Sequence, residues 1–160
     1  MIKIGDKLPE TAFKTMGKDG PQEKTGSDLF KNKRVLLVGA PGAFTPACHR
    51  NHVPGYIQNA DALTAKGIDK IYVTTVNDVF VMGEWEKASN ANGKITFLAD
   101  GSADFAKAAG LSLDASAHGL GIRSQRYAMV VNDGTVESLA VEDVPSNVGI
   151  SGAEEVLKTL

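Results

Sequence analysis

The sequence predicts an α/β fold with a central sheet flanked by helices. Short apolar runs rich in β-branched residues alternate with helical patterns along the chain, an order that is typical of this fold class. No repeat, low-complexity tract or proline- and serine-rich linker divides the 160 residues. Because this length suits one domain with its own core, we expect residues 1–160 to form a single domain.

Three apolar runs predict buried strands. Residues 34–40, RVLLVGA, form a continuous apolar run that Pro41 and Gly42 end, which is the pattern of a strand buried on both faces. Residues 70–76 and 94–100 are rich in β-branched side chains, and a helix-like stretch that ends in a glycine precedes each of them. We therefore expect the first run to be a central strand and the other two to be buried strands as well.

Outside these runs, the pattern predicts a hairpin, an exposed N-terminal element and a closing helix. Residues 126–141 contain two strand-like runs around the Asn-Asp-Gly sequence at 132–134, a strong hairpin signal. Glycines and a proline interrupt residues 11–30, so we expect a short exposed hairpin or loop there. Near the C-terminus, Ser151 followed by Glu154 matches a capping box that begins a helix.

The single cysteine lies at the start of a predicted helix. Thr45 is a hydroxyl N-cap and Pro46 suits the first helical position, so Cys48 would be the third residue of the helix. Apolar residues keep a helical spacing up to residues 66–67, which predicts a long helix. Pro54 lies inside this segment and lacks the amide hydrogen that the helix needs, so we expect a kink there.

This position favours the thiolate form of Cys48. A helix N-terminus carries unpaired amide donors and the positive end of the helix dipole, and both stabilise an anion. Cys48 is therefore a candidate nucleophile, and the alternative from position alone is a small buried apolar residue. His52, one turn later, could add positive charge near the thiolate or be a hydrogen-bonded polar residue, whereas we expect His49 on the solvated surface. A metal needs three or four ligands, so no metal site is expected.

The composition argues against several functional classes. The 17 basic and 19 acidic residues are spread along the chain, which disfavours nucleic-acid binding. No segment is long and apolar enough to span a bilayer, so we expect no membrane role. The N-terminal residues lack the pattern of a secretion signal, and one cysteine cannot form an internal disulfide, so we expect the reducing cytoplasm.

The residues around the cysteine resemble a known active-site motif. PGAFTPACHRNHVPGY, residues 41–56, is similar to the active-site segment of the peroxiredoxins, in particular of the peroxiredoxin-5-like (type II, atypical) subfamily. Residues 76–85, 98–100 and 123–134 resemble further landmarks of this subfamily in the same order. The resemblance implies a thioredoxin-like fold with a central mixed sheet flanked by helices. It also implies a thiol peroxidase that reduces hydrogen peroxide and alkyl hydroperoxides.

The resemblance assigns roles to four residues. Cys48 would be the peroxidatic cysteine, which attacks the O–O bond and becomes a sulfenic acid. Arg126 would hold the thiolate and the leaving oxygen, Thr45 would bind the peroxide, and Pro41 would shield the thiolate. The Thr45 hydroxyl could also accept from the Cys48 amide as a helix cap, and both arrangements are physically sound. Arg123 is the rival arginine, which would face outward or serve as a reserve donor.

Phe44 and His52 are further candidates for the substrate pocket, and Phe44, Phe80 and Trp85 are candidates for the pocket wall or for an interface. Relatives of this kind commonly form homodimers with the active site near the interface, so a homodimer is expected. Ordinary core packing is the more natural role for Trp85.

The lone cysteine also predicts how the enzyme is recycled. Many relatives carry a second, resolving cysteine, and this chain has none. We therefore expect a one-cysteine variant that needs no cofactor and is reduced by an external thiol: glutathione, with or without glutaredoxin, or thioredoxin. The same site chemistry would serve a peroxide-sensing regulator that passes oxidation to a partner protein, and an adaptor with an inert thiol is a third reading.

Overall fold

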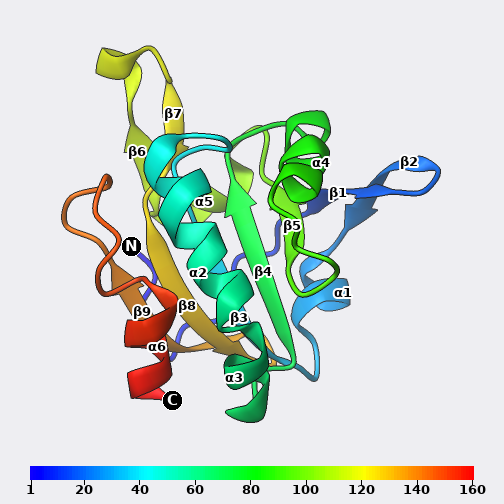
Figure 1. Cartoon of the computed structure of the whole chain (residues 1–160), viewed down its shortest axis with the longest axis vertical. Coiled ribbons are helices and arrows are strands. Elements are labelled where there is room, and N and C mark those ends of the chain that lie inside the picture. Colours follow the sequence, from blue (N-terminus) through cyan, green and yellow to red (C-terminus); the bar gives the residue numbers. More distant parts are fainter.

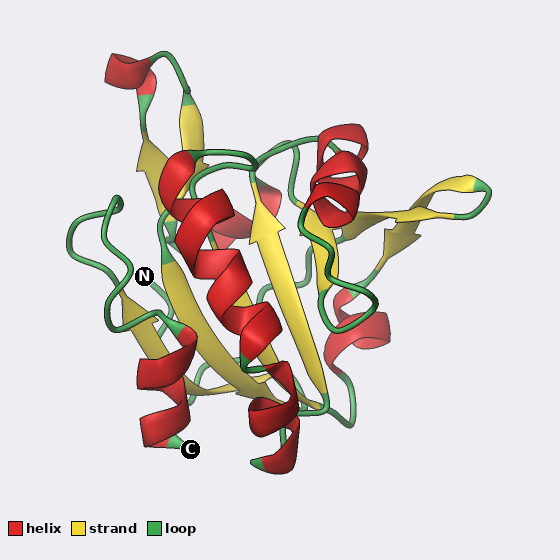
Figure 2. Cartoon of the chain, viewed as in Figure 1, coloured by secondary structure: helices red, strands yellow, loops and turns green.

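A seven-stranded mixed sheet forms the centre of the protein, and helices pack on both of its faces (Figure 1, Figure 2). The computed structural model describes residues 1–160. The strands are β1 (Phe13–Gly17), β2 (Gly20–Lys24), β3 (Arg34–Gly39), β4 (Lys70–Thr75), β5 (Thr96–Ala99), β8 (Tyr127–Asn132) and β9 (Thr135–Val141). A separate two-stranded sheet pairs β6 (Ser112–Asp114) with β7 (Ile122–Ser124). The predicted α/β class is confirmed.

The helical segments connect these strands. They are α1 (Gly26–Phe30), η1 (Cys48–His52), α2 (Val53–Gln58), α3 (Ala60–Ala65), α4 (Val79–Ala88), α5 (Asp104–Ala108), η2 (Ser116–His118) and α6 (Ala153–Thr159). None of them combines the length and the apolar composition that a membrane span requires.

The strand order is β2-β1-β5-β4-β3-β8-β9, with parallel pairing of β3, β4 and β5 and antiparallel pairing elsewhere. β3 lies between β4 and β8 and is buried over nearly its whole length, as its apolar sequence predicts. Leu36 and Val38 point to one face of the sheet, while Val35 and Leu37 point to the other. Both faces of this strand therefore need a cover of apolar side chains.

Two layers of helices provide that cover. Helices α2, α3, α4 and α6 pack on the face of Leu36 and Val38, where Tyr56 and Trp85 fill the core. Helices α1 and α5 pack on the opposite face with Phe30 and Phe105. Each face thus has its own hydrophobic core, and Cys48 belongs to the first of them.

The predicted hairpins are confirmed. β8 and β9 are joined by a two-residue turn in which Asp133 and Gly134 have φ values of 48° and 80°, the conformation that an Asp-Gly pair favours. Within residues 11–30, which the sequence indicated as an exposed hairpin or loop, residues 13–24 form a hairpin of β1 and β2 that projects from the body of the protein (Figure 1). Residues 26–30 form helix α1 instead, and its Leu29 and Phe30 are buried in the core.

A close approach sets the register between β3 and β8. Gly39 pairs with Tyr127, and the aromatic ring of Tyr127 lies where a side chain at position 39 would be. Only a glycine leaves room for this ring. The end of β3 therefore lies beside the start of β8. The segment that follows β3 and the segment that precedes β8 meet at this end of the two strands.

The C-terminal helix begins later than the capping box predicts. The N-cap of α6 is Gly152, and no side chain caps the helix. The hydroxyl of Ser151 donates instead to the carboxylate of Glu142 at 2.6 Å. The prediction of a closing helix is confirmed, but the prediction that Ser151 caps it is wrong, because a buried carboxylate binds its hydroxyl.

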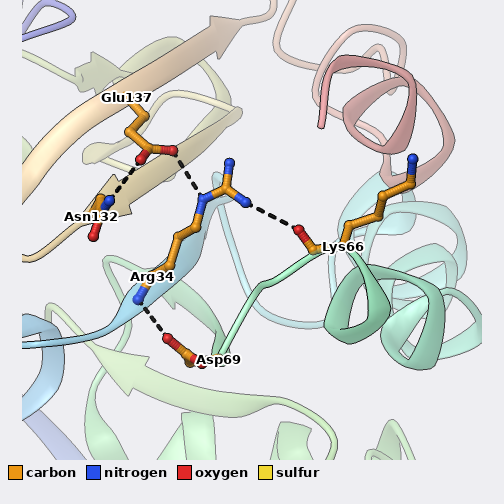
Figure 3. Close-up of polar contacts among 5 residues, drawn as sticks. All are labelled: Arg34, Lys66, Asp69, Asn132 and Glu137. Carbon is orange, nitrogen blue, oxygen red and sulfur yellow. Dashed lines mark hydrogen bonds and ion pairs between the residues drawn. The ribbon is translucent and has the colours of Figure 1, made fainter.

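At the opposite end of β3, Arg34 joins three segments of chain (Figure 3). Its Nε donates to Glu137 on β9 at 3.0 Å, and its Nη1 donates to the carbonyl oxygen of Lys66 after α3 at 3.1 Å. The backbone amide of Arg34 donates to the Asp69 carboxylate at 2.8 Å, and Asn132 binds the second oxygen of Glu137. One forked guanidinium thus ties β3, β9 and the end of α3 together.

Replacing Arg34 with methionine should lower the free energy of unfolding by about 1–2 kcal/mol, because two hydrogen bonds of a charged donor are lost at a site that is one-third exposed. Urea denaturation measures the change. As a control, Lys14→Met removes a more exposed ion pair with Glu23 and should cost about 0.5 kcal/mol or less. Equal effects of the two substitutions would contradict the connecting role of Arg34.

Candidate active site

Side-chain hydrogen bonds hold the turn after β3 against the sheet. The carboxamide oxygen of Asn77 accepts from the amide of Ala43 at 2.9 Å and from the hydroxyl of Thr75 at 2.8 Å. Phe44 has a φ of 62°, in the left-handed region that a non-glycine residue rarely adopts. Such strain persists only where surrounding contacts hold the backbone, and Asn77 supplies one of them. The chain therefore enters the next helix from a fixed direction.

Thr45 lies in this turn and does not cap the helix. Its hydroxyl donates to the carbonyl oxygen of Gly42 at 2.6 Å. The amide hydrogen of Cys48 has no acceptor among the protein atoms. Of the two arrangements that the sequence left open, the structure therefore has the one in which the Cys48 amide is free to bind a ligand. The Thr45 hydroxyl proton is engaged, so its oxygen can act toward a ligand only as an acceptor.

The helix that carries Cys48 contains a π-helical turn. The segment η1 runs from Cys48 to His52, and the amide of Val53 donates to the carbonyl oxygen of Cys48, five residues back. This wider turn lies directly before Pro54, which stands in the first turn of α2, where the missing amide hydrogen is tolerated. The predicted long helix is also divided, because Asn59 separates α2 from α3.

Cys48 and Arg126 meet in the interior. The Cys48 side chain is fully buried, and Arg126 is 2% exposed. The Nη2 of Arg126 lies 3.0 Å from the Cys48 Sγ, although 78 residues separate the two in the chain. Arg126 stands directly before β8, at the strand start that the resemblance implies. The register of Gly39 with Tyr127 brings the two residues to the same end of these strands.

The other nitrogens of Arg126 also have partners. Its Nε donates to the carbonyl oxygen of Pro145 at 2.7 Å, and its Nη1 lies 2.9 Å from the Nδ1 of His52. Because a guanidinium can only donate, the His52 Nδ1 must be the acceptor, and its Nε2 then carries the hydrogen. That Nε2 donates to the carbonyl oxygen of Ser151 at 3.0 Å. Arg126 is therefore held at all three of its nitrogens.

His52 is neutral in this environment. Burial, together with the positive charge of Arg126, lowers the pKa of His52 to about 4, and the hydrogen bond to Ser151 offsets only part of this shift. The suggestion that His52 adds positive charge near the thiolate is therefore wrong, and its alternative role as a hydrogen-bonded polar residue is the one observed. His52 lies behind Arg126 and is 1% exposed, so it reaches a substrate only through the arginine.

Only one group in contact with the buried guanidinium of Arg126 could carry a negative charge, the sulfur of Cys48. No carboxylate forms an ion pair with this guanidinium. Its three partners are a sulfur, a neutral imidazole and a carbonyl oxygen. A buried cation without a counter-charge is costly, and the Cys48 sulfur is the one contacting group that could supply that charge.

Three aromatic rings, those of Phe44, His49 and Trp85, lie close together near the start of the Cys48 helix. The Nδ1 of His49 accepts from the indole Nε1 of Trp85 at 3.0 Å, so His49 is half-buried and not the solvated residue that the sequence suggested. The ring of Phe44 lies 5.4 Å from that of His49 and 6.4 Å from that of Trp85, between ring centres. Phe44 therefore packs beside these two rings and does not line the pocket next to Arg126.

An open, mainly apolar pocket of about 680 Å³ adjoins Arg126. Pro41 and Thr45 line it on one side, and residues of the β6–β7 hairpin and of the loop at 144–146 line it on the other. The structure thus brings together Pro41, Thr45 and Arg126 at one pocket, with Cys48 in contact with the arginine. Arg123, the rival arginine, donates to the carbonyl oxygens of Leu120 and Pro41 and does not reach the sulfur.

Sequence reasoning missed two polar residues behind the site. Glu142 and Ser151 are buried and hydrogen-bonded to each other, and Ser151 also accepts from His52. Glu142 carries no local pattern that would identify it, and the local pattern at Ser151 indicated a helix cap and not a contact behind the site. No group of three or more His, Cys, Asp or Glu side chains is placed to hold a metal ion.

The comparisons with known proteins agree with this geometry. The redoxin family model matches residues 3–157. Peroxiredoxin-2C of Oryza sativa subsp. japonica is 44% identical, and the alignment covers 99% of this chain and 98% of the relative. A structure from Burkholderia cenocepacia, provisionally described as a thioredoxin reductase, is 47% identical with a TM-score of 0.96, and the match covers 100% of this chain and 98% of that one.

A further solved structure links the fold to the chemistry. Reduced Prx3 from Vibrio vulnificus, in complex with hydrogen peroxide, is 45% identical with a TM-score of 0.94 over 99% of each chain. This match confirms the thioredoxin-like fold with a mixed sheet flanked by helices. Together, the family model and the relatives identify the chain as a member of the redoxin family and, within it, of the peroxiredoxins, the enzymes that reduce peroxides with a thiol.

Proposed function

We propose that this peroxiredoxin reduces hydrogen peroxide and alkyl hydroperoxides by direct attack of the Cys48 thiolate. The observation that carries the proposal is the 3.0 Å contact between the Cys48 sulfur and Nη2 of the buried Arg126. The thiolate attacks one peroxide oxygen, the S–O bond forms and the O–O bond breaks. Cys48 becomes a sulfenic acid, and the second oxygen leaves as hydroxide or alkoxide, which takes a proton from water.

Donors and acceptors around Cys48 match the polarity of a peroxide. The free amide of Cys48 can donate to the peroxide, whereas the Thr45 oxygen can accept the hydrogen of its O–H group. Arg126 stabilises the negative charge that grows on the leaving oxygen, which is the largest requirement of this reaction. Pro41 adds an apolar wall that limits the access of water to the sulfur.

The pocket and one relative support the choice of substrates. The Vibrio structure is described with hydrogen peroxide bound to a reduced peroxiredoxin, which supports the same substrate here. The mainly apolar pocket next to Arg126 has room for the organic group of an alkyl hydroperoxide.

An external thiol completes the proposed cycle. Because the chain has one cysteine, the sulfenic acid condenses with a thiol such as glutathione to a mixed disulfide and water. A second thiol then attacks the disulfide and restores Cys48. Glutaredoxin or thioredoxin could supply either step, and a reducing compartment such as the cytoplasm would provide these reductants. We also propose a homodimer, because two large aromatic side chains are exposed: Phe44, whose ring lies beside Trp85 of α4, and Phe80 on α4 itself.

Arg126→Gln should slow the oxidation of Cys48 by hydrogen peroxide about 100- to 1000-fold, because the reaction loses its charged donor. Stopped-flow mixing followed by mass spectrometry of the trapped sulfenic acid measures the rate constant, with Cys48→Ser as the blank. Arg50→Gln makes the same change at an exposed arginine on the helical segment of Cys48; it is the matched control and should stay near the wild-type rate. Similar losses in both variants would argue against a specific role of Arg126.

The neutral state of His52 predicts a loss of stability in acid. The pKa of His52 is about 4 in the folded protein and 6.5 in an unfolded chain, so only the unfolded state binds this proton between the two values. The free energy of unfolding should therefore fall by up to about 3 kcal/mol as the pH decreases from 6.5 to 4. His52→Gln should lack this part of the pH dependence in urea titrations. Parallel curves for both proteins would contradict it.

Glutathione should convert peroxide-oxidised protein to a mixed disulfide at Cys48 and then return it to the thiol. Intact-mass spectrometry follows the added glutathione, and consumption of peroxide over many turnovers measures the full cycle. Thioredoxin and glutaredoxin are tested in parallel. If the sulfenic acid is formed quickly but no thiol reductant supports turnover, the recycling enzyme is excluded in favour of a regulator that passes oxidation to a partner protein.

A further inference from the structure

Glu142 is a buried carboxylate that the proposed reaction does not use. It directly follows β9 and is 8% exposed. A single oxygen of its side chain, Oε2, accepts three hydrogen bonds, from the amide of Gly149 at 2.8 Å, the amide of Ser151 at 2.8 Å and the hydroxyl of Ser151 at 2.6 Å. One carboxylate oxygen therefore closes the loop at 143–151 onto its own starting point.

The same loop supplies the carbonyl groups that orient the active site from behind. The Pro145 carbonyl oxygen accepts from Nε of Arg126 at 2.7 Å, and the Ser151 carbonyl oxygen accepts from Nε2 of His52 at 3.0 Å. The hydroxyl of Tyr56 donates to the Ser151 carbonyl as well. Apart from the Cys48 sulfur, every partner of the Arg126 guanidinium is thus either a carbonyl of this loop or a residue held by one. The backbone carbonyl oxygen of Arg126 also accepts from the amide of Glu142 at 2.9 Å.

The charge of Glu142 makes these loop contacts strong. Burial alone would raise the pKa of Glu142, but the hydrogen bonds from Ser151 and Gly149 outweigh it and keep the pKa below its usual value. The group is therefore an ionised acceptor of charge-assisted hydrogen bonds. The Ser151 hydroxyl binds this carboxylate although it stands next to the start of α6, where a serine would ordinarily serve as a cap.

We propose that Glu142 is a positioning residue for the Cys48–Arg126 pair. By fixing the loop at 143–151, it places the Pro145 and Ser151 carbonyl groups, and these set the direction in which Arg126 points its Nη2 at the sulfur. The inference rests on the proposed roles of Cys48 and Arg126, and it adds a residue that acts on them through the loop at 143–151. Glu142 itself does not touch the reacting atoms.

The test removes the charge or one hydrogen bond while keeping the shape. Glu142→Gln should slow both oxidation of Cys48 by hydrogen peroxide and its alkylation by iodoacetamide about 10-fold, because a displaced Arg126 no longer faces the sulfur. Ser151→Ala, which loses only the hydroxyl, should slow both about 3-fold. Asp143→Asn makes the same change of charge at the adjacent, exposed residue and is the control, expected to stay within about 2-fold.

A spectroscopic readout separates positioning from general damage to the fold. The thiolate of Cys48 absorbs near 240 nm, and the part of that absorbance at pH 7 that iodoacetamide abolishes reports the thiolate fraction. This fraction should fall in Glu142→Gln and Ser151→Ala but not in Asp143→Asn, while circular dichroism stays unchanged.

Each outcome decides the question. Wild-type thiolate fraction and alkylation rate in a folded Glu142→Gln protein would overturn the inference. If that variant does not fold, unchanged values in Ser151→Ala would overturn it, and a smaller shift in the expected direction would support it. The alkylation and absorbance measurements use no peroxide, so they test the positioning role even if the wild-type protein reacts with peroxide no faster than a free thiolate, a result that would overturn the proposed peroxidase function alone.

Discussion

The guanidinium of Arg126 is permanently charged and almost completely buried, so the protein around it must supply both an anion and hydrogen-bond acceptors. The sulfur of Cys48 is the one partner in contact that can become an anion. His52 and the Pro145 carbonyl oxygen bind the other two nitrogens. The contact with the Cys48 sulfur is thus the one place beside this guanidinium where a counter-charge could form.

The sheet makes this contact possible. Cys48 follows β3 and Arg126 precedes β8, and the antiparallel pairing of these strands brings both to the same end. The ring of Tyr127 over Gly39 prevents the register from slipping, since a shift would force the ring against a side chain. At the opposite end of β3, Arg34 makes a comparable but more exposed set of contacts that serves the fold alone.

Much of this architecture can be predicted from local pattern. The apolar run of β3 and the Asp-Gly turn between β8 and β9 depend on nearby residues, so periodicity and turn chemistry identify them. The pairing of Cys48 with Arg126 came from a family resemblance and not from spacing. The hydroxyl of Ser151 and the imidazole of His49 were misjudged, because their partners, Glu142 and Trp85, are 9 and 36 residues away in the sequence. Local rules cannot weigh such distant competitors.

The π-helical turn at Cys48–His52 has a consequence for how this enzyme can change during evolution. One residue more than an α-helix requires is stored in this turn, and each residue rotates a helix by about 100°. Deleting one of the residues between Cys48 and His52 would rotate the cysteine relative to the rest of the helix by about 100° and turn it away from the arginine. The turn therefore sets the rotation of the Cys48 end of the helix relative to the rest. The length of this segment is constrained even at exposed positions such as Arg50 and Asn51, whose side chains contact neither Cys48 nor Arg126.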